Sequence, residues 1–346
     1  GKALLSGLLS RVESRVYSNR LHHYHLPESP IFILGHWRSG TSYLQSLLGA
    51  PPGYLFFNKY QTIFPDSFLL TRKILKPAIN YLMARSAFVK SWKDGVTHDF
   101  DSLDTASEIE VAIMNQFEPF SFHWGQVFTK HWRDYFDRYL FMERISPELL
   151  QKWKQDVLYL HKKVNFTEPG ARLVVKNPGD TARVKFLRQL YPDARFIFIH
   201  RNPYDVFYST RKLWTRIVAN IGLQDIDSES MDKAIRYIYR RMHRRYFEDR
   251  KSIPDHRLIE IRYDHLLDRP WSILQQISDV LDLPNFEQHI PYYQKYMQSH
   301  QHVPSQYQYR DADIRLINRE WRFIFEQLQY TLQWHRQPFR QNLALS

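Results

Sequence analysis

The chain has 346 residues, no cysteine, and 48 Lys and Arg residues against 36 Asp and Glu, a formal net charge of +12. This length leaves room for a large core in a single α/β domain, and the lack of cysteine excludes disulfides and thiolate metal sites. No run of about 18 apolar residues occurs, so we expect no transmembrane helix. The basic residues are spread along the chain without a recognised nucleic-acid-binding module, so we expect no nucleic-acid partner.

The N-terminal segment carries the pattern of an amphipathic helix. Over residues 2–20, one helical stripe is apolar and consists of Leu4, Leu5, Leu8, Leu9, Val12 and Val16. We predict an N-terminal helix and linker over residues 1–28 and the main domain over 29–346. The helix either docks on that domain or lies on a membrane surface. We therefore expect a cytoplasmic protein, with peripheral membrane contact as the alternative for this helix.

The segment after residue 30 predicts a phosphate-binding loop. Residues 31–34 are apolar and predict a buried strand, Gly35 begins a turn, and a helix-compatible run follows. A strand that leads through such a turn into a helix directs backbone N–H groups at an anion. The spacing of glycines nearly matches the nucleotide P-loop, but Thr41 replaces its lysine and Arg38 supplies the charge. The predicted phosphate-binding residues are Arg38, Ser39, Gly40, Thr41 and Ser42.

A second basic strand end predicts a second phosphate site. Residues 195–199 predict a buried strand that is followed by Arg201, with Asn202 as helix N-cap and Pro203 as the first helical residue. A magnesium-dependent NTPase usually places an aspartate at such a strand end. Two arginine-bearing junctions therefore predict two separate phosphates and no metal. We also predict no metal site at three clustered histidines without a nearby carboxylate, His22, His23 and His25.

The order of predicted elements indicates the fold. Strands are expected near 31–34, 173–175, 195–199 and 258–261, and helices near 42–49, 68–90, 105–116, 147–164, 181–190, 203–219, 229–251, 271–281 and 313–334. Strands that alternate with helices predict a P-loop-like parallel sheet with helices on both faces in a single α/β domain. The ligand is then expected at the carboxyl ends of the strands.

At these residues the chain resembles the sulfotransferases that use 3′-phosphoadenosine 5′-phosphosulfate (PAPS). Arg38–Ser42 resembles the 5′-phosphosulfate loop, in the bacterial branch with Gly-His-Trp-Arg-Ser-Gly-Thr, and the segment Arg201–Ser209 resembles the 3′-phosphate motif. Lys176 resembles the strand-end lysine, and Tyr263 lies in a segment similar to the one near the adenine. The resemblance implies the sulfotransferase fold for residues 29–346, PAPS as donor, 3′,5′-adenosine bisphosphate as product, and no metal.

The resemblance implies in-line transfer of the sulfuryl group from PAPS to an acceptor hydroxyl. Lys176 would stabilise the leaving oxygen, and Arg201 and Ser209 would hold the 3′-phosphate. Aromatic residues make up 16% of the chain and cluster over 54–68 and 117–124, mostly as core and partly as a candidate acceptor pocket. We therefore favour a sterol- or lipid-like alcohol as acceptor. The alternatives are a sugar or phenol acceptor, a P-loop small-molecule kinase, and an inactive binding protein. The oligomeric state stays open.

The acceptor proton needs a base. The segment that contains Glu108 and Glu110 resembles a Glu-x-Glu segment of the bacterial branch. Two residues apart on a helix, these side chains point about 160° apart, so only one can face the site. We predict Glu108 as the base, with His98 and Glu110 as the alternatives.

Overall fold

The chain folds around one parallel sheet. The computed structural model describes residues 2–85, 103–116, 120–300 and 305–333. Within these residues, five strands lie in the order β2-β3-β1-β4-β5, all parallel. The strands are β1 (Ile31–Leu34), β2 (Tyr54–Leu55), β3 (Arg172–Lys176), β4 (Arg195–His200) and β5 (Leu258–Arg262). The four predicted strands are confirmed; β2 was missed because two residues at a sheet edge give no periodic pattern.

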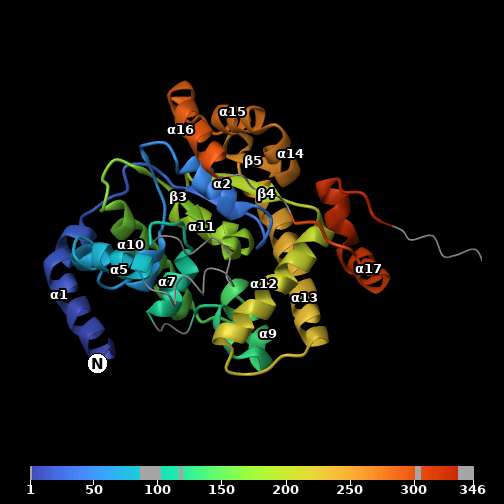
Figure 1. The fold of residues 1–346 in the computed structure, drawn as a ribbon, viewed down its shortest axis with the longest axis horizontal. Helices are drawn as coiled ribbons and strands as arrows, with labels where there is room; N and C mark the ends of the chain where they lie inside the picture. Colours follow the sequence, from blue (N-terminus) through green and yellow to red (C-terminus); the bar gives the residue numbers. More distant parts are fainter. Residues whose placement is uncertain (1, 86–102, 117–119, 301–304, 334–346) are drawn as a thin grey trace, which may run out of the picture.

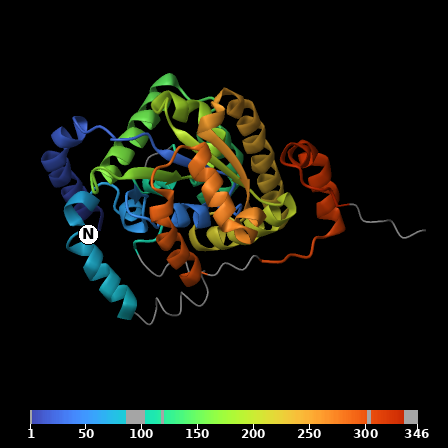
Figure 2. The same ribbon diagram turned by 90° about the horizontal axis from the view of Figure 1, so that it is seen from above.

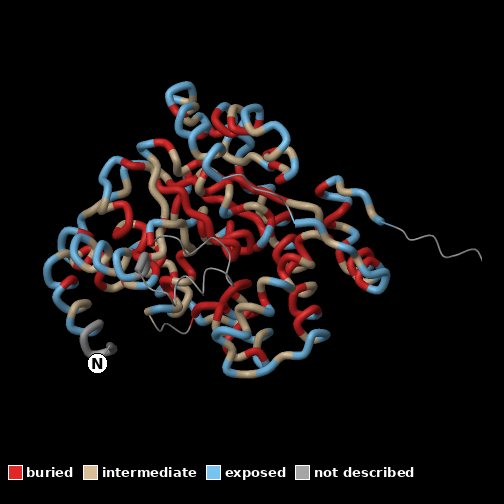
Figure 3. The backbone as a smooth tube through the Cα atoms, in the orientation of Figure 1, coloured by how far each residue is buried: buried red, intermediate tan, exposed pale blue. Residues whose placement is uncertain are grey.

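The central strand is buried on both faces, as Figure 3 shows for the core of the molecule. Successive side chains of a strand point to opposite faces, so Ile31 and Ile33 enter one core cluster and Phe32 and Leu34 the other. This explains why the strand is a continuous apolar run.

Helices cover both faces of the sheet (Figure 1), which confirms the predicted fold class. One layer consists of α2 (Thr41–Leu48), α14 (Tyr263–Asp268), α15 (Pro270–Val280) and α16 (Phe286–Ser299). The opposite layer includes α7 (Ile109–Asn115), α10 (Pro147–Asn165), α11 (Val184–Leu190), α12 (Pro203–Ile221), α13 (Ser228–Asp249) and α17 (Asp311–Leu328). Asn202 and Pro203 begin α12 as predicted, and the Asn202 side chain accepts a hydrogen bond from the Tyr204 amide at 3.0 Å.

Several helices differ from the prediction. The expected helix 68–90 is divided into α4 (Phe68–Thr71) and α5 (Leu75–Arg85), and its last five residues lie outside the described part. Short elements were missed because four or five residues carry no 3.6-residue period. They are α3 (Lys59–Ile63), α8 (Trp124–Val127), α9 (Trp132–Tyr135) and a π-helical turn, η3 (Phe136–Leu140). The α16 helix was also missed; it contains Pro291, which argues against a helix in sequence.

The N-terminal helix is confirmed as α1 (Lys2–His22), but its predicted apolar stripe does not form the docking face. Leu8, Val12 and Val16 are 58%, 38% and 51% exposed. A neighbouring face of the helix packs on the domain, where the buried Glu13 forms an ion pair with the buried Lys163 of α10. Figure 2 shows α1 and α5 at one end of the molecule and α17 at the other. No described helix is long and apolar enough to cross a membrane.

Candidate active site

The four predicted motifs meet at one edge of the sheet. Because β3, β1, β4 and β5 are adjacent and parallel, their carboxyl ends lie side by side. The loop after β1 begins at Gly35, β3 ends at Lys176, Arg201 follows β4, and Tyr263 follows β5. A set of residues separated by more than 200 positions in sequence therefore shares one site.

The loop after β1 is held by its own hydrogen bonds. The Gly35 amide donates to the Thr181 hydroxyl at 2.8 Å, and the Ser39 hydroxyl donates to the His36 carbonyl at 2.7 Å. Gly40 has φ 100° and caps α2, and a Cβ atom at this position would lie 2.2 Å from a ring carbon of Tyr263. The loop requires glycine here both for its backbone angle and for the approach of the tyrosine ring.

Arg38 brings the two predicted phosphate motifs into contact. Its backbone is left-handed, with φ 70°. Its side-chain Nε donates to the hydroxyl of Ser209 on α12 at 2.8 Å. The arginine predicted to serve one phosphate thus lies beside the serine predicted to serve the other.

Arg201 is held from three sides. Its guanidinium donates to the carboxylate of Asp205, one helical turn away, with Nη2 3.1 Å from Oδ2. The same nitrogen donates to the Ser305 carbonyl at 3.3 Å, and the guanidinium lies 5.3 Å from the centre of the Tyr263 ring. Burial raises the pKa of Tyr263 to about 12, so the phenol is neutral beside this charge. Asp205, Ser305 and Tyr263 therefore fix the position of the Arg201 guanidinium at the carboxyl end of β4.

Lys176 and Glu108 form an ion pair at the same edge. The ammonium of Lys176 is 4% exposed and lies 2.8 Å from Oε1 of Glu108, whose side chain is 18% exposed. The predicted helix begins later than expected, so Glu108 is the N-cap of α7 and has an extended backbone. The preceding residue, Ser107, donates its amide to the Phe57 carbonyl at 2.8 Å, which fixes this segment against the chain after β2.

Glu110 belongs to the core of the protein. Its Oε2 accepts from Arg183 at 2.8 Å, both side chains are 0% exposed, and its Oε1 accepts from the Phe122 amide at 3.3 Å. Nearby, burial raises the pKa of Asp180 to about 7, with the Arg183 charge opposing the rise. Glu110 therefore has a protein partner at each carboxylate oxygen, which favours Glu108 over Glu110 as the candidate for the base. His98 lies outside the described residues.

His123, the N-cap of α8, was not among the predicted site residues, but it lies close to Glu108. Its Nε2 lies 4.0 Å from Oε2 of Glu108, and its Nδ1 lies 2.9 Å from Oε1 of Gln126. The only signal in the sequence was its place in an aromatic stretch, which by itself indicates core packing. No group of three His, Cys, Asp or Glu side chains among the described residues could hold a metal ion.

The aromatic clusters lie mostly in the core. Phe57, Tyr60, Phe68 and Phe122 are all at most 2% exposed, so they do not line an open pocket. Trp124 instead borders a cavity of about 610 Å³, together with Phe128, His131, Asp134, Tyr135, Arg138 and Tyr139. A second cavity, of about 390 Å³, lies at the amino ends of β3 and β4, away from the predicted site, and is lined mainly by charged residues.

The sequence and the fold both match known sulfotransferases. A profile of the sulfotransferase family matches residues 30–288, so the chain belongs to this family. The chain is 26% identical over 329 residues to the omega-hydroxy-beta-dihydromenaquinone-9 sulfotransferases Stf3 of Mycobacterium bovis and Mycobacterium tuberculosis, covering 95% of this chain and 82% of each relative.

Two solved structures share the fold. Sulfotransferase STF9 from Mycobacterium avium has a TM-score of 0.74 at 18% identity and covers 95% of this chain and 83% of its own. Sulfotransferase STF1 from Mycobacterium tuberculosis has a TM-score of 0.67 at 17% identity and covers 92% and 82%. These similarities show that the chain has the same overall fold as these two sulfotransferases.

The packing of Tyr263 on Gly40 can be tested by comparing two alanine substitutions. Gly40→Ala and Gly170→Ala both place a side chain at positive φ, 100° and 97°, but only Gly40 has an atom within 4 Å of the new Cβ. We expect each to lower the free energy of unfolding by about 1 kcal/mol through backbone strain. Gly40→Ala should cost about 1–3 kcal/mol more because the ring must move. Urea unfolding gives both values, and equal losses would contradict the account.

Proposed function

We propose that the chain transfers the sulfuryl group of PAPS to the hydroxyl of a lipophilic acceptor. The observation that carries this proposal is the Lys176–Glu108 pair, 2.8 Å apart, at the sheet edge where Arg38 and Arg201 also lie. Sulfuryl transfer requires a cation near the leaving oxygen, a base near the acceptor oxygen, and anchors for the donor. These residues can supply all three from one edge of the sheet.

The residues present fit the donor nucleotide. The loop after β1 leads into the N-terminus of α2, a position that suits an anion, and Arg38 and Arg201 provide a cation at each of two strand ends. Arg38 and the amides of residues 39–42 would hold the 5′-phosphosulfate, and Arg201 and Ser209 would hold the 3′-phosphate. Tyr263 would lie near the adenine. When bound, PAPS supplies the sulfuryl group that is transferred.

Lys176 and Glu108 would act in a coupled way. In the proposed step, Glu108 takes the proton from the acceptor hydroxyl while the acceptor oxygen attacks sulfur. A protonated carboxyl group no longer attracts the ammonium of Lys176 as a carboxylate does. Lys176 is then free to turn toward the leaving oxygen as negative charge develops there. The pair would therefore link proton removal to stabilisation of the leaving group.

A lipid-like alcohol is the acceptor we favour. The Stf3 relatives are named for a hydroxylated menaquinone, and the chain covers 82% of their length. The cavity of about 610 Å³ is lined by four aromatic side chains together with His131, Asp134 and Arg138, and its lining residue Trp124 directly follows His123 in the chain. Such a cavity suits an apolar substrate with few polar groups. A kinase function is disfavoured because Thr41 replaces the P-loop lysine and Arg201 stands where a metal-binding aspartate is expected.

Substitution of a residue that anchors the donor and substitution of the residue at the leaving oxygen should affect different kinetic constants. Arg201→Ala should raise the KM for PAPS roughly 10- to 100-fold, equivalent to about 1.5–3 kcal/mol for a charge-assisted contact, with a smaller change in kcat. Lys176→Ala should mainly lower kcat, because its contact strengthens as the leaving oxygen becomes charged.

The assay follows label from [³⁵S]PAPS into geranylgeraniol in detergent. Arg195→Ala is the matched control, since Arg195 lies at the amino end of β4 and Arg201 follows its carboxyl end. It should leave both parameters near those of the wild type. Equal effects of Arg201→Ala and Lys176→Ala on KM and kcat would refute the assigned roles.

The proposed base is tested by Glu108→Gln. Glutamine keeps the size of the side chain but cannot take the acceptor proton, so kcat should fall on the order of 10²–10⁴-fold. The affinity for 3′,5′-adenosine bisphosphate, measured by calorimetry, should stay within about threefold of the wild type. A nearly normal kcat for Glu108→Gln would show that another group takes the acceptor proton.

A further inference from the structure

His123 is a buried histidine with one unsatisfied ring nitrogen. The residue is 9% exposed, and its ring lies 4.6 Å from that of Phe122. Among the residues that the structure describes, Nε2 is buried without a hydrogen-bond partner. Burying a polar atom without a partner costs free energy, so such an atom calls for an explanation.

The surroundings of His123 determine which nitrogen carries the hydrogen. Nδ1 lies 2.9 Å from Oε1 of Gln126, which is an acceptor. In a neutral imidazole only one nitrogen is protonated, so Nδ1–H donates to Gln126 and Nε2 presents a lone pair. This lone pair can accept a proton.

The nearby acidic group is the proposed base. Nε2 of His123 lies 4.0 Å from Oε2 of Glu108, while the other oxygen of Glu108 is bound to Lys176 at 2.8 Å. A distance of 4.0 Å is longer than a hydrogen bond, and a rotation of the carboxyl group or one bridging water would close it. The three side chains thus form the series Lys176, Glu108, His123.

From this arrangement, and on the basis of the proposed function, we propose that His123 is a proton-relay residue that returns Glu108 to its charged form. The acceptor O–H bond breaks, and its proton binds Oε2 of Glu108. At the same time the acceptor oxygen forms the new S–O bond. The S–O bond to phosphate breaks and leaves its electron pair on the phosphate oxygen. The proton then passes from Oε2 to Nε2 of His123. The carboxylate is restored and binds Lys176 again, and the imidazolium releases the proton to solvent.

The relay predicts a difference between the first turnover and later ones. In His123→Gln, Glu108 can still take one proton, so the single-turnover rate of sulfuryl transfer should stay within about threefold of the wild type. Steady-state kcat should fall about tenfold or more, because the variant lacks the imidazole through which, in this proposal, the carboxyl group passes on its proton. In His123→Gly, added imidazole should restore part of the lost kcat. Both rates use [³⁵S]PAPS and geranylgeraniol.

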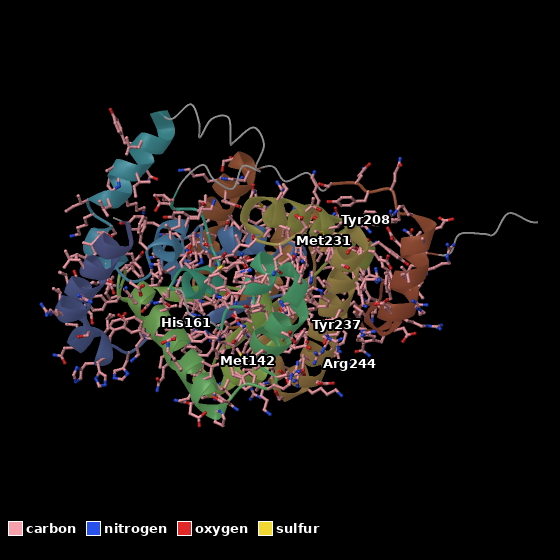
Figure 4. The ribbon with its side chains drawn as sticks, turned by 90° about the horizontal axis from the view of Figure 1, so that it is seen from below. Met142, His161, Tyr208, Met231, Tyr237 and Arg244 are labelled. Carbon is pink, nitrogen blue, oxygen red and sulfur yellow. The ribbon has the colours of Figure 1, made fainter. Side chains whose placement is uncertain are left out.

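His161→Gln is the matched control. His161 is also buried with an unpartnered Nε2 among the described residues, but it lies on α10 (Figure 4), and Nδ1 contacts the Tyr191 hydroxyl. This variant should leave both rates unchanged. Gln126→Leu removes the acceptor that fixes the tautomer of His123 and should lower kcat with the same preserved first turnover. The affinity of His123→Gln for 3′,5′-adenosine bisphosphate shows whether that variant is folded. If it is not, Gln126→Leu provides the second test.

Two results would overturn the relay. One is a kcat of His123→Gln within twofold of the wild type, and the other is a single-turnover rate that falls by the same factor as kcat, which is the mark of a structural or direct role. Failure of the wild-type protein to transfer any label from PAPS would instead refute the proposed function, so the two failures are distinguishable.

Discussion

A buried ion pair connects the chain segment that carries Lys176 with the segment that carries Glu108. Arg183 and Glu110, both 0% exposed, join the turn after β3 to the start of α7. Removing one partner of a buried pair leaves the other charge uncompensated and costs about 3–5 kcal/mol. Lys176 precedes the turn that contains Arg183, and Glu108 lies two residues before Glu110. We therefore expect the 2.8 Å contact between Lys176 and Glu108 to depend on the ion pair between Arg183 and Glu110.

The cations at the sheet edge are oriented before any ligand arrives. Asp205 and the Tyr263 ring hold Arg201, and the Ser209 hydroxyl holds Arg38. A side chain that is already restrained loses less conformational entropy when it binds an anion. The match over residues 30–288 shows the family, and in our proposal the protein mainly positions groups and supplies charge. In our proposal, preorganised arginines would anchor the donor, and the more mobile step would be the exchange of Lys176 between Glu108 and the leaving oxygen.

The sequence predicted local features well and long-range contacts poorly. The strand ends and the Asn202–Pro203 helix start were predictable because apolar runs and capping residues are local patterns. The position of Glu108 beside Lys176 depends on packing between segments 68 positions apart, and only the resemblance to a family indicated it. His123 was missed because an isolated histidine in an aromatic stretch has no pattern of its own. The exposed stripe of α1 was misleading, since the face that packs on the domain is another one, which carries the ion pair of Glu13 and the buried Leu21.

We propose that the carboxyl ends of the strands bind two phosphates of an adenosine nucleotide without a metal. Calorimetry with 3′,5′-adenosine bisphosphate in the presence of a chelator, and separately with ATP and magnesium, tests it most directly. We expect the bisphosphate to bind in the presence of the chelator, with an affinity that falls as the salt concentration rises because the contacts are ionic. Binding of ATP that requires magnesium, together with no binding of the bisphosphate, would contradict it.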